Sequence, residues 1–333
     1  MKMPPRAWLT LSVLLLAACG ERAGPPASTV RDSAGVTIVE STAPAWDAGE
    51  AWSVPAEPLL RVGAAEGQPG ELLSGVTGAV RLMHGGVAVA DAGSQEVRFF
   101  DSDGRFVRAV GGAGQGPGEF AGLSRLGPAP GGGLWAWDFS ARRITWMDAD
   151  GEVVRLTTLG PEPPVLNAVG ALADGTFVLK QLWGARRTAE AAEGGFRRDP
   201  VAFVRFDTTG TLLDTIAMVP GREIHLTEED GRGVMVTPVV GRNAVGAVAG
   251  RAVVIGSQDA FELRVLAPDG ALRRIARVGG RDLSLTAGEY ARILDEYVES
   301  VPEERRPGLR ATVEGLPAPE TRPAYGGVRV DAG

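Results

Sequence analysis

The sequence predicts an all-β protein built from repeated antiparallel units of four strands each. The first observation is a repeat: residues 85–108 and 132–155 align without a gap at an offset of 47 residues. A third copy occupies 251–274, and a fourth is split between 173–179 and 204–212. The second observation is that every copy alternates short apolar runs with glycine-containing turns. A four-stranded repeat of about 40–50 residues is the period of a propeller blade, so we expect a β-propeller.

Each copy follows one plan. In the first, an alternating run at 87–90 and a second at 97–100 predict two strands. The turn at 101–104 (Asp-Ser-Asp-Gly) follows, because Asp hydrogen-bonds its own turn backbone and Gly supplies a positive φ. A strand at 105–110 comes next, and the apolar run at 76–82 precedes the copy. The same reasoning predicts four complete blades, near 76–111, 123–160, 166–219 and 243–279.

The connectors between blades carry a more specific pattern. Residues 114–120 (Gly-Gln-Gly-Pro-Gly-Glu-Phe) closely resemble the blade-to-blade linker of NHL-type six-bladed β-propellers, and 61–72 is similar to them. The opening at 30–40 resembles the start of a group of bacterial six-bladed propeller lipoproteins. The resemblance covers about 30–280 well and 281–333 loosely. It implies six blades in the complete ring.

The sequence accounts for fewer blades than that resemblance implies. Strands are expected at 36–40 and 58–62 before the first blade, and 323–330 resembles the opening of a fifth. A ring closes by pairing strands from both ends, because open strand edges invite aggregation. We therefore expect the N-terminal strands to close the ring. We also expect the sequence to be truncated at its C-terminus, short of six blades by about one and a half.

The N-terminus predicts secretion and lipidation. Lys2 and Arg6 precede an apolar run at 8–16, which is the pattern of a secretory signal and is too short to span a bilayer. Residues 16–19 (Leu-Ala-Ala-Cys) resemble the lipobox of bacterial lipoproteins. That resemblance implies cleavage before Cys19 and attachment of lipid to its thiol. The expected organisation is a signal peptide over 1–18, a flexible tether over 19–33 and a propeller over 34–333, with a helical insertion near 285–300.

The use of cysteine supports the same interpretation. Cys19 is the only cysteine in 333 residues, whereas a disulfide-stapled secreted domain carries an even set. The alternative is an ordinary secretory signal with a stray cysteine. By resemblance to lipoprotein sorting, Gly20 after the cysteine favours the outer membrane. We expect a protein of the cell envelope, anchored to the membrane through its N-terminal lipid and facing the periplasm.

The long insertions identify a candidate binding face. Residues 183–200 lie between the second and third strands of the third blade, while 220–242 and 280–322 connect outer strands to inner strands. In a propeller these two kinds of loop share one face, and function in repeat folds tends to lie on the face with the insertions. Within the last insertion, Thr286 begins a capping box and apolar residues follow at helical spacing, which predicts a helix over about 287–299.

Six side chains are candidate ligand contacts. Four arginines could form a basic rim for an anionic ligand such as a sugar acid or a phosphate, although a solvated loop explains them too. A histidine in the second insertion could line a pocket, and a glutamate recurs in the connectors, where it could instead fix the turn. They are Arg186, Arg187, Arg197, Arg198, His225 and Glu119.

Catalytic chemistry has little support in the sequence. With only two histidines, a His-rich metal site is excluded, and no nucleophile elbow is present. Asp91 and Asp138 end equivalent strands, where carboxylates could bind Ca²⁺ or cap turns. Lys180 and Ser257 take their place in the other copies, so no ring of acids forms. The net charge of −7, with mixed signs, argues against a nucleic-acid partner.

These features predict a membrane-tethered β-propeller that serves as a binding or scaffold lipoprotein of the cell envelope. An unknown protein or small molecule would bind its insertion-bearing face, and the sequence identifies neither that ligand nor a cofactor. One alternative is a propeller enzyme resembling a lactonase or lyase, with a possible Ca²⁺ site. Another is a subunit of an envelope assembly complex. The fold by itself does not choose between them.

Overall fold

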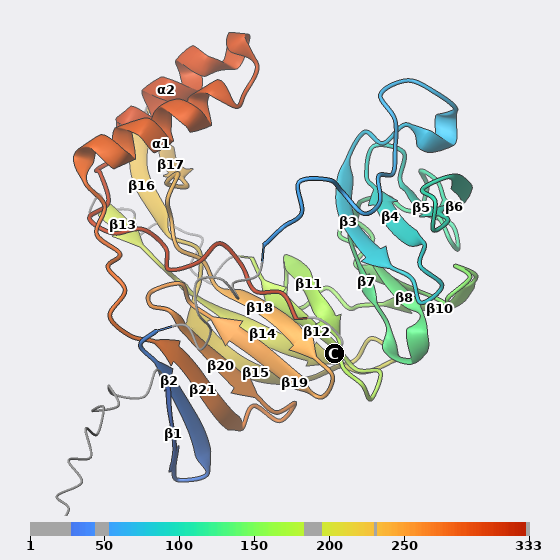
Figure 1. Ribbon diagram of the computed structural model, residues 1–333, viewed down its shortest axis with the longest axis horizontal. Helices are drawn as coiled ribbons and strands as arrows, with labels where there is room; N and C mark the ends of the chain where they lie inside the picture. The colour runs from blue at the N-terminus through green and yellow to red at the C-terminus, as the bar shows by residue number, and fades with distance from the viewer. Residues whose placement is uncertain (1–27, 44–52, 183–194, 230–231, 331–333) are drawn as a thin grey trace, which may run out of the picture.

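The computed structural model describes residues 28–43, 53–182, 195–229 and 232–330, and it consists mainly of antiparallel strands arranged as four four-stranded blades (Figure 1). The first blade comprises β3 (Val76–Arg81), β4 (Val87–Asp91), β5 (Glu96–Phe100) and β6 (Phe106–Gly111), and the second comprises β7 (Leu123–Pro128), β8 (Leu134–Asp138), β9 (Arg143–Met147) and β10 (Val153–Thr158). The third comprises β11 (Leu166–Ala171), β12 (Phe177–Gln181), β14 (Pro200–Phe206) and β15 (Leu212–Pro220), and the fourth comprises β18 (Val245–Ala249), β19 (Ala252–Gly256), β20 (Glu262–Leu266) and β21 (Leu272–Val278). The all-β propeller fold that the repeat predicts is thus confirmed.

The aspartate turns form as the repeat predicts. Asp101 accepts hydrogen bonds from the backbone N–H groups of Asp103 and Arg105, both at 2.9 Å. Asp148 and Asp207 make the same pair of contacts in the second and third blades. A short side chain that satisfies two backbone donors fixes a tight turn between adjacent strands. These turns therefore set the register of the outer strands in each of the three blades.

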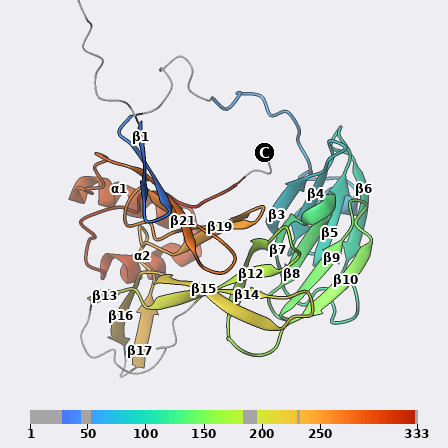
Figure 2. The ribbon, with the colours of Figure 1, turned by 90° about the horizontal axis from the view of Figure 1, so that it is seen from below.

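The hydrophobic core lies between neighbouring blades. Where the second blade meets the third, the ring of Phe177 lies 4.9 Å from that of Trp135 and 5.7 Å from that of Trp146, both in edge-to-face geometry. Phe203 and Ile255 are buried in the corresponding cluster between the third and fourth blades. The inner strands contact one another in chain order, β3 with β7, β7 with β11 and β11 with β18. The four blades therefore follow one another along an arc, as Figure 2 shows.

The N-terminal hairpin extends the fourth blade. It comprises β1 (Ser28–Ser33) and β2 (Val36–Ser41), and β2 pairs in parallel with β21, with Ile38 opposite Ile275. Glu40 reaches Arg277 at 3.4 Å across this pairing. Contrary to expectation, these strands do not close the ring but extend the sheet of the fourth blade. The outer edge of β21 offers them unpaired backbone groups, and pairing with β2 produces a six-stranded sheet.

Two expected strands do not form. Residues 58–62 run over the first blade without strand pairing, and residues 323–330, the expected opening of a fifth blade, also form no strand. The first segment passes so close to the turn at Gly104 that a Cβ there would lie 2.3 Å from the carbonyl oxygen of Arg61. The second segment is held to the fourth blade by separate hydrogen bonds, such as that from the backbone N–H of Ala324 to the carbonyl oxygen of Gln258 at 3.0 Å.

The three insertions form additional elements outside the blades. They are the strands β13 (Gly195–Arg197), β16 (Ile224–Glu229) and β17 (Arg232–Val236) and the helices α1 (Ala287–Glu299) and α2 (Arg306–Glu314). Short 3-10 helices occur at η1 (Pro69–Glu71), η2 (Pro130–Gly132) and η3 (Glu303–Arg305). The helix expected over about 287–299 forms as α1, and the Thr286 hydroxyl accepts from the backbone N–H of Glu289 at 3.3 Å.

Candidate binding site

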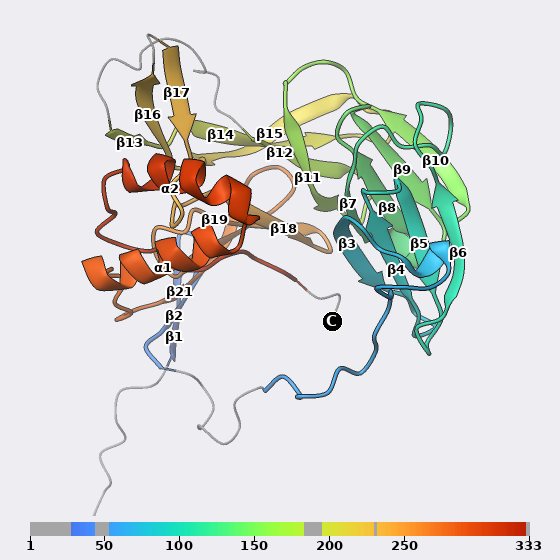
Figure 3. The ribbon, with the colours of Figure 1, turned by 90° about the horizontal axis from the view of Figure 1, so that it is seen from above.

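The insertions assemble into one body on a single face of the blades. Strand β13 lies in the insertion of the third blade, and β16 lies in the connector that follows this blade. The two strands pair, although β14 and β15 separate them in the sequence. Helices α1 and α2 pack their buried residues, among them Leu294 and Val313, against Val239 and Val240 beside β17. Figure 3 shows this body of strands and helices standing beside the third and fourth blades. We call it the insertion body (residues 195–199, 221–242 and 280–322).

Arg198 joins the insertion body to the blades. Its guanidinium donates to the carbonyl oxygens of Pro220 at 3.1 Å, Gly221 at 2.9 Å and Ser257 at 2.7 Å. It also forms an ion pair with Asp259 at 2.5 Å, and its side chain is 12% exposed. A guanidinium with so many fixed acceptors serves as an anchor between the third and fourth blades.

The other predicted side chains are dispersed. Arg197 pairs with Asp199 at 2.8 Å, and His225 stacks edge-to-face with Phe196 at 5.3 Å, within the small sheet. Glu119 accepts from the backbone N–H of Gly116 at 2.8 Å, an arrangement that suits the turn-fixing role. Arg186, Arg187 and Cys19 lie outside the described residues. The predicted basic rim of four arginines therefore stays a prediction.

A cationic cluster on the same face was missed by the sequence analysis. Lys180 is the penultimate residue of β12, and its ammonium donates to the carbonyl oxygen of Ala244 at 2.6 Å and to Oδ1 of Asn243 at 3.4 Å. Burial, and the nearby positive charges of Arg222 and Arg125, lower the pKa of Lys180 to about 8. We call Arg125, Lys180 and Arg222 the cationic cluster. The prediction that Lys180 takes the place of Asp91 and Asp138 is wrong by one residue, because the strand pairing puts Gln181 at that place.

The positions equivalent to Gln181 in the first two blades hold structural carboxylates. Asp138 is fully buried and accepts from the backbone N–H groups of Ala121 at 2.7 Å and Ala141 at 2.8 Å. Asp91, also fully buried, accepts from the N–H groups of Ser74 and Gly93. Each carboxylate thereby links the loop before the inner strand of its blade to the turn that follows the second strand. Among the residues that the structure describes, no three side chains of His, Cys, Asp or Glu converge as a metal site would require.

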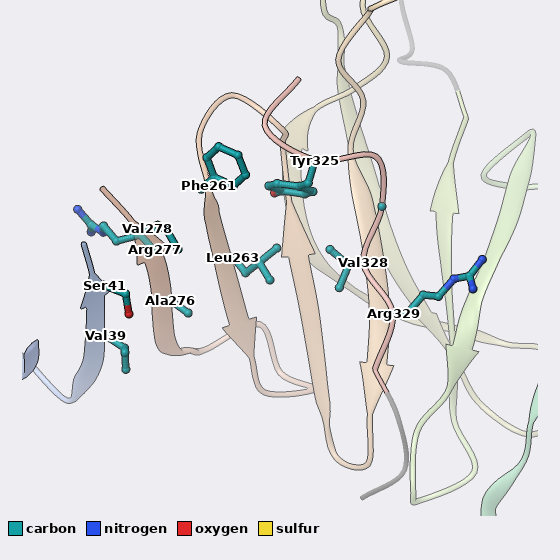
Figure 4. Close-up of a pocket in the computed structure, with 11 residues that line it drawn as sticks. Val39, Ser41, Phe261, Leu263, Ala276, Arg277, Val278, Tyr325, Val328 and Arg329 are labelled. Atoms are coloured by element: carbon teal, nitrogen blue, oxygen red, sulfur yellow. The ribbon is translucent and has the colours of Figure 1, made fainter. Parts of the chain in front are cut away.

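A second candidate lies on the fourth blade, on the face opposite to the third blade. A cavity of about 400 Å³ lies between the sheet β2–β21–β20 and the segment 325–329 (Figure 4). Leu263 and Val328 face each other across it, and Phe261 and Tyr325 line one end. This lining is apolar and could accept an apolar group. Arg277 also borders the cavity, but its guanidinium points away from it and pairs with Glu40 at 3.4 Å and Glu262 at 3.5 Å.

Tyr325 explains why residues 323–330 cross the blade. Its hydroxyl donates to the carbonyl oxygen of Glu262 at 2.9 Å, and its own carbonyl accepts from the side-chain amide of Gln258 at 2.6 Å. The ring lies where a Cβ on residue 256 would be 1.8 Å from the hydroxyl, so Gly256 makes this close approach possible. These contacts hold the segment against β19 and β20 in place of a ladder along an inner strand.

Comparisons with known proteins agree on the fold. A family model described as a six-bladed β-propeller matches residues 70–126. A comparison with curated protein sequences gave no match. No helix among the described residues is both long enough and apolar enough to cross a membrane.

Several solved structures are similar to this chain. A protein of Bacteroides fragilis described as exported has 16% identity and a TM-score of 0.42, and the match covers 71% of this chain and 62% of that one. A member of the DUF4221 family from Bacteroides vulgatus has 14% identity and a TM-score of 0.43, with 65% and 60% covered. Virginiamycin B lyase from Staphylococcus aureus has 12% identity and a TM-score of 0.29, with 62% and 85% covered. The chain spans less than two thirds of the length of the first two. With its four-stranded antiparallel blades and its family match, the chain is a β-propeller protein that resembles the six-bladed kind.

Proposed function

We propose that this protein is a lipid-anchored binding module of the cell envelope, in which the propeller presents the insertion body to a ligand or partner. Cys19 would carry the lipid, and residues 20–33 would connect it to the blades. Residues 28–33 of the predicted tether form strand β1 of the N-terminal hairpin, so the flexible part is proposed for the residues before Ser28. The membrane is then the first partner, and the ligand of the insertion-bearing face is the second.

The observation that carries the proposal is the assembly of the insertions. Three separate segments, each interrupting a regular repeat, fold together through the pairing of β13 with β16 and the packing of α1 and α2 on Val239 and Val240. Unrelated decorations would not need to cooperate in this way. Within the same body, Arg242 forms an ion pair with Glu223 at 3.3 Å. Arg242 also contacts the fourth blade through Asp259 at 3.7 Å. In repeat proteins, ligands and partners usually bind on the face that carries such insertions.

Anchoring is tested by labelling. The full-length protein, expressed in a Gram-negative host supplied with a labelled fatty acid, should incorporate the label and sediment with the membranes. Cys19→Ala should remove both properties, since it deletes only the thiol that would be acylated. An unlabelled wild-type protein in the soluble periplasmic fraction would contradict the lipid anchor.

Binding through the insertion-bearing face is tested by site-specific photo-crosslinking in the intact envelope. Glu296 is exposed on α1, while Asp103 is exposed in the turn at the opposite end of the first blade and serves as the matched control. We expect adducts from position 296 and none from position 103. Equal labelling from both positions, or labelling from 103 alone, would contradict the proposed face.

A further inference from the structure

We propose that the apolar cavity of the fourth blade takes up an acyl chain of the protein's own N-terminal lipid. This inference rests on the proposed function, because it requires a lipid on Cys19, and it deepens that function by giving the lipid a second environment. The acyl chain would exchange between the membrane and the cavity. The floor of the cavity, the place where the chain enters the fold and the chemistry of the lining all point to this occupant.

The floor of the cavity is one face of strands β2, β21 and β20. The register forms an apolar row across these strands, because Ala276 lies opposite Val39 in one pairing and opposite Leu263 in the other. All three side chains line the cavity. Neighbouring residues of a strand point to opposite faces, so Arg277 directs its guanidinium to the other side, as Figure 4 shows. The strand register therefore keeps the floor free of charge.

This apolar row continues beyond the cavity to the edge of the sheet. Strand β1 pairs antiparallel with β2 and places Val30 opposite Val39. Residues directly opposite each other in antiparallel strands share a face, so Val30 extends the row. Val30 is 68% exposed, and β1 is the edge strand of the six-stranded sheet. Apolar side chains therefore lead from the edge strand into the cavity.

The N-terminal segment enters the fold beside the same cavity. Ser28, the first residue of β1, lies opposite Ser41, which lines the cavity. Cys19 is nine residues before Ser28, and nine residues span at most about 30 Å when fully extended. A lipid on Cys19 is therefore tethered within reach of the cavity. A short tether gives its acyl chain an effective concentration in the millimolar range, which favours it over a free apolar molecule.

The lining suits a hydrocarbon chain. Val328 faces Leu263 across the cavity, and the rings of Phe261 and Tyr325 line one end (Figure 4). The hydroxyl of Tyr325 already donates to the carbonyl oxygen of Glu262 at 2.9 Å. The volume of about 400 Å³ is in the range of small-molecule sites. Each CH₂ group that leaves water for such a lining stabilises the bound chain.

The test is photo-crosslinking from the lipid itself. The full-length protein is expressed in a Gram-negative host supplied with a fatty acid that carries a diazirine, and intact envelopes are irradiated. We expect peptides in which the acyl chain on Cys19 is crosslinked to β20 or to residues 325–329. Leu263→Gln should lower their yield about tenfold, because it places an amide where the chain would lie. Val107→Gln is the matched control and should leave the yield unchanged, because Val107 is exposed on β6, the outer strand of the first blade.

A labelled Cys19 that crosslinks only to membrane lipids or to other parts of the chain would overturn this inference and leave the anchor intact. The same crosslinks in Cys19→Ala would also overturn it, because they would come from a free membrane lipid. If Leu263→Gln fails to fold, Val328→Gln decides, because Val328 lies in a segment without strand pairing. Absence of label from Cys19 would overturn the anchor and this inference with it. Incorporation of the label is measured before irradiation, so the two failures are distinguishable.

Discussion

The residue that ends the second strand of a blade differs between the first two blades and the third. In the first two it is a fully buried aspartate, Asp91 or Asp138, whose carboxylate accepts backbone N–H groups and closes the blade. In the third it is Gln181, whose side-chain oxygen accepts from the backbone N–H of Ala202 at 3.0 Å. The first two blades use a carboxylate at this position for stability. The third blade, where the long insertion interrupts the repeat, uses a neutral amide, and the preceding residue, Lys180, contacts the next blade through Ala244.

The largest effect is expected where the carboxylate is structural. Asp138→Ala should destabilise the protein by about 3 kcal/mol, because it leaves the buried N–H groups of Ala121 and Ala141 without acceptors. Urea denaturation followed by fluorescence measures this. Asp103→Ala removes an exposed carboxylate that contacts only Arg105, so it should change stability by less than about 1 kcal/mol. Similar losses of stability in both variants would contradict the difference between a buried structural carboxylate and an exposed one.

A smaller effect is expected from the lysine, and it depends on pH. The folded-state pKa of Lys180 is lowered to about 8, so the unfolded chain binds more protons between about pH 8 and the ordinary value. The wild-type protein should therefore gain about 2 kcal/mol of stability relative to Lys180→Met as the pH rises from 8 to 10.5. Paired urea denaturations across this range measure the difference. If the difference in stability between the two proteins does not change with pH, then burial and the nearby arginines do not lower the pKa of Lys180.

The smallest effect concerns the insertion body. Thr286→Ala removes the hydroxyl that caps α1 and should cost about 1 kcal/mol of local stability. Its partner Glu289 is held to Thr286 and Arg322, and these hydrogen bonds lower its pKa to about 2. This stabilisation is complete above the ordinary pKa and is lost as the pH falls from there toward 2. The protection factors of α1 amides in hydrogen exchange should therefore fall in Thr286→Ala, and in the wild type at acid pH, while those of the first blade are unaffected.

Local signals explain how much of the fold the sequence could predict. The blades were predictable because the Asp turns and the alternating strands lie within a few residues of each other, as at Asp101 and Asp148. Helix α1 was predictable because its capping box adjoins its apolar period. The pairing of β2 with β21 was not, since nothing near residue 38 specifies a partner at residue 275.

The candidate site was less predictable for the same reason. The sequence around Arg198 does not distinguish a structural anchor from a ligand contact. Its hydrogen-bond acceptors at Pro220 and Ser257 lie on other segments of the chain. Lys180 was aligned with the aspartates of the repeat, whereas the strand pairing puts Gln181 at their position. Its significance depends on Arg125 and Arg222, which only the packing of the blades brings close.

The most direct test of the account is the titration of Lys180 itself. The chain contains only two lysines, Lys2 and Lys180, so the full chain with Cys19→Ala and Lys2→Arg has a single one. NMR of the labelled lysine should give a pKa of about 8, lowered by burial and by the adjacent arginines. An ordinary lysine pKa would contradict the burial of this ammonium against Ala244 and Asn243.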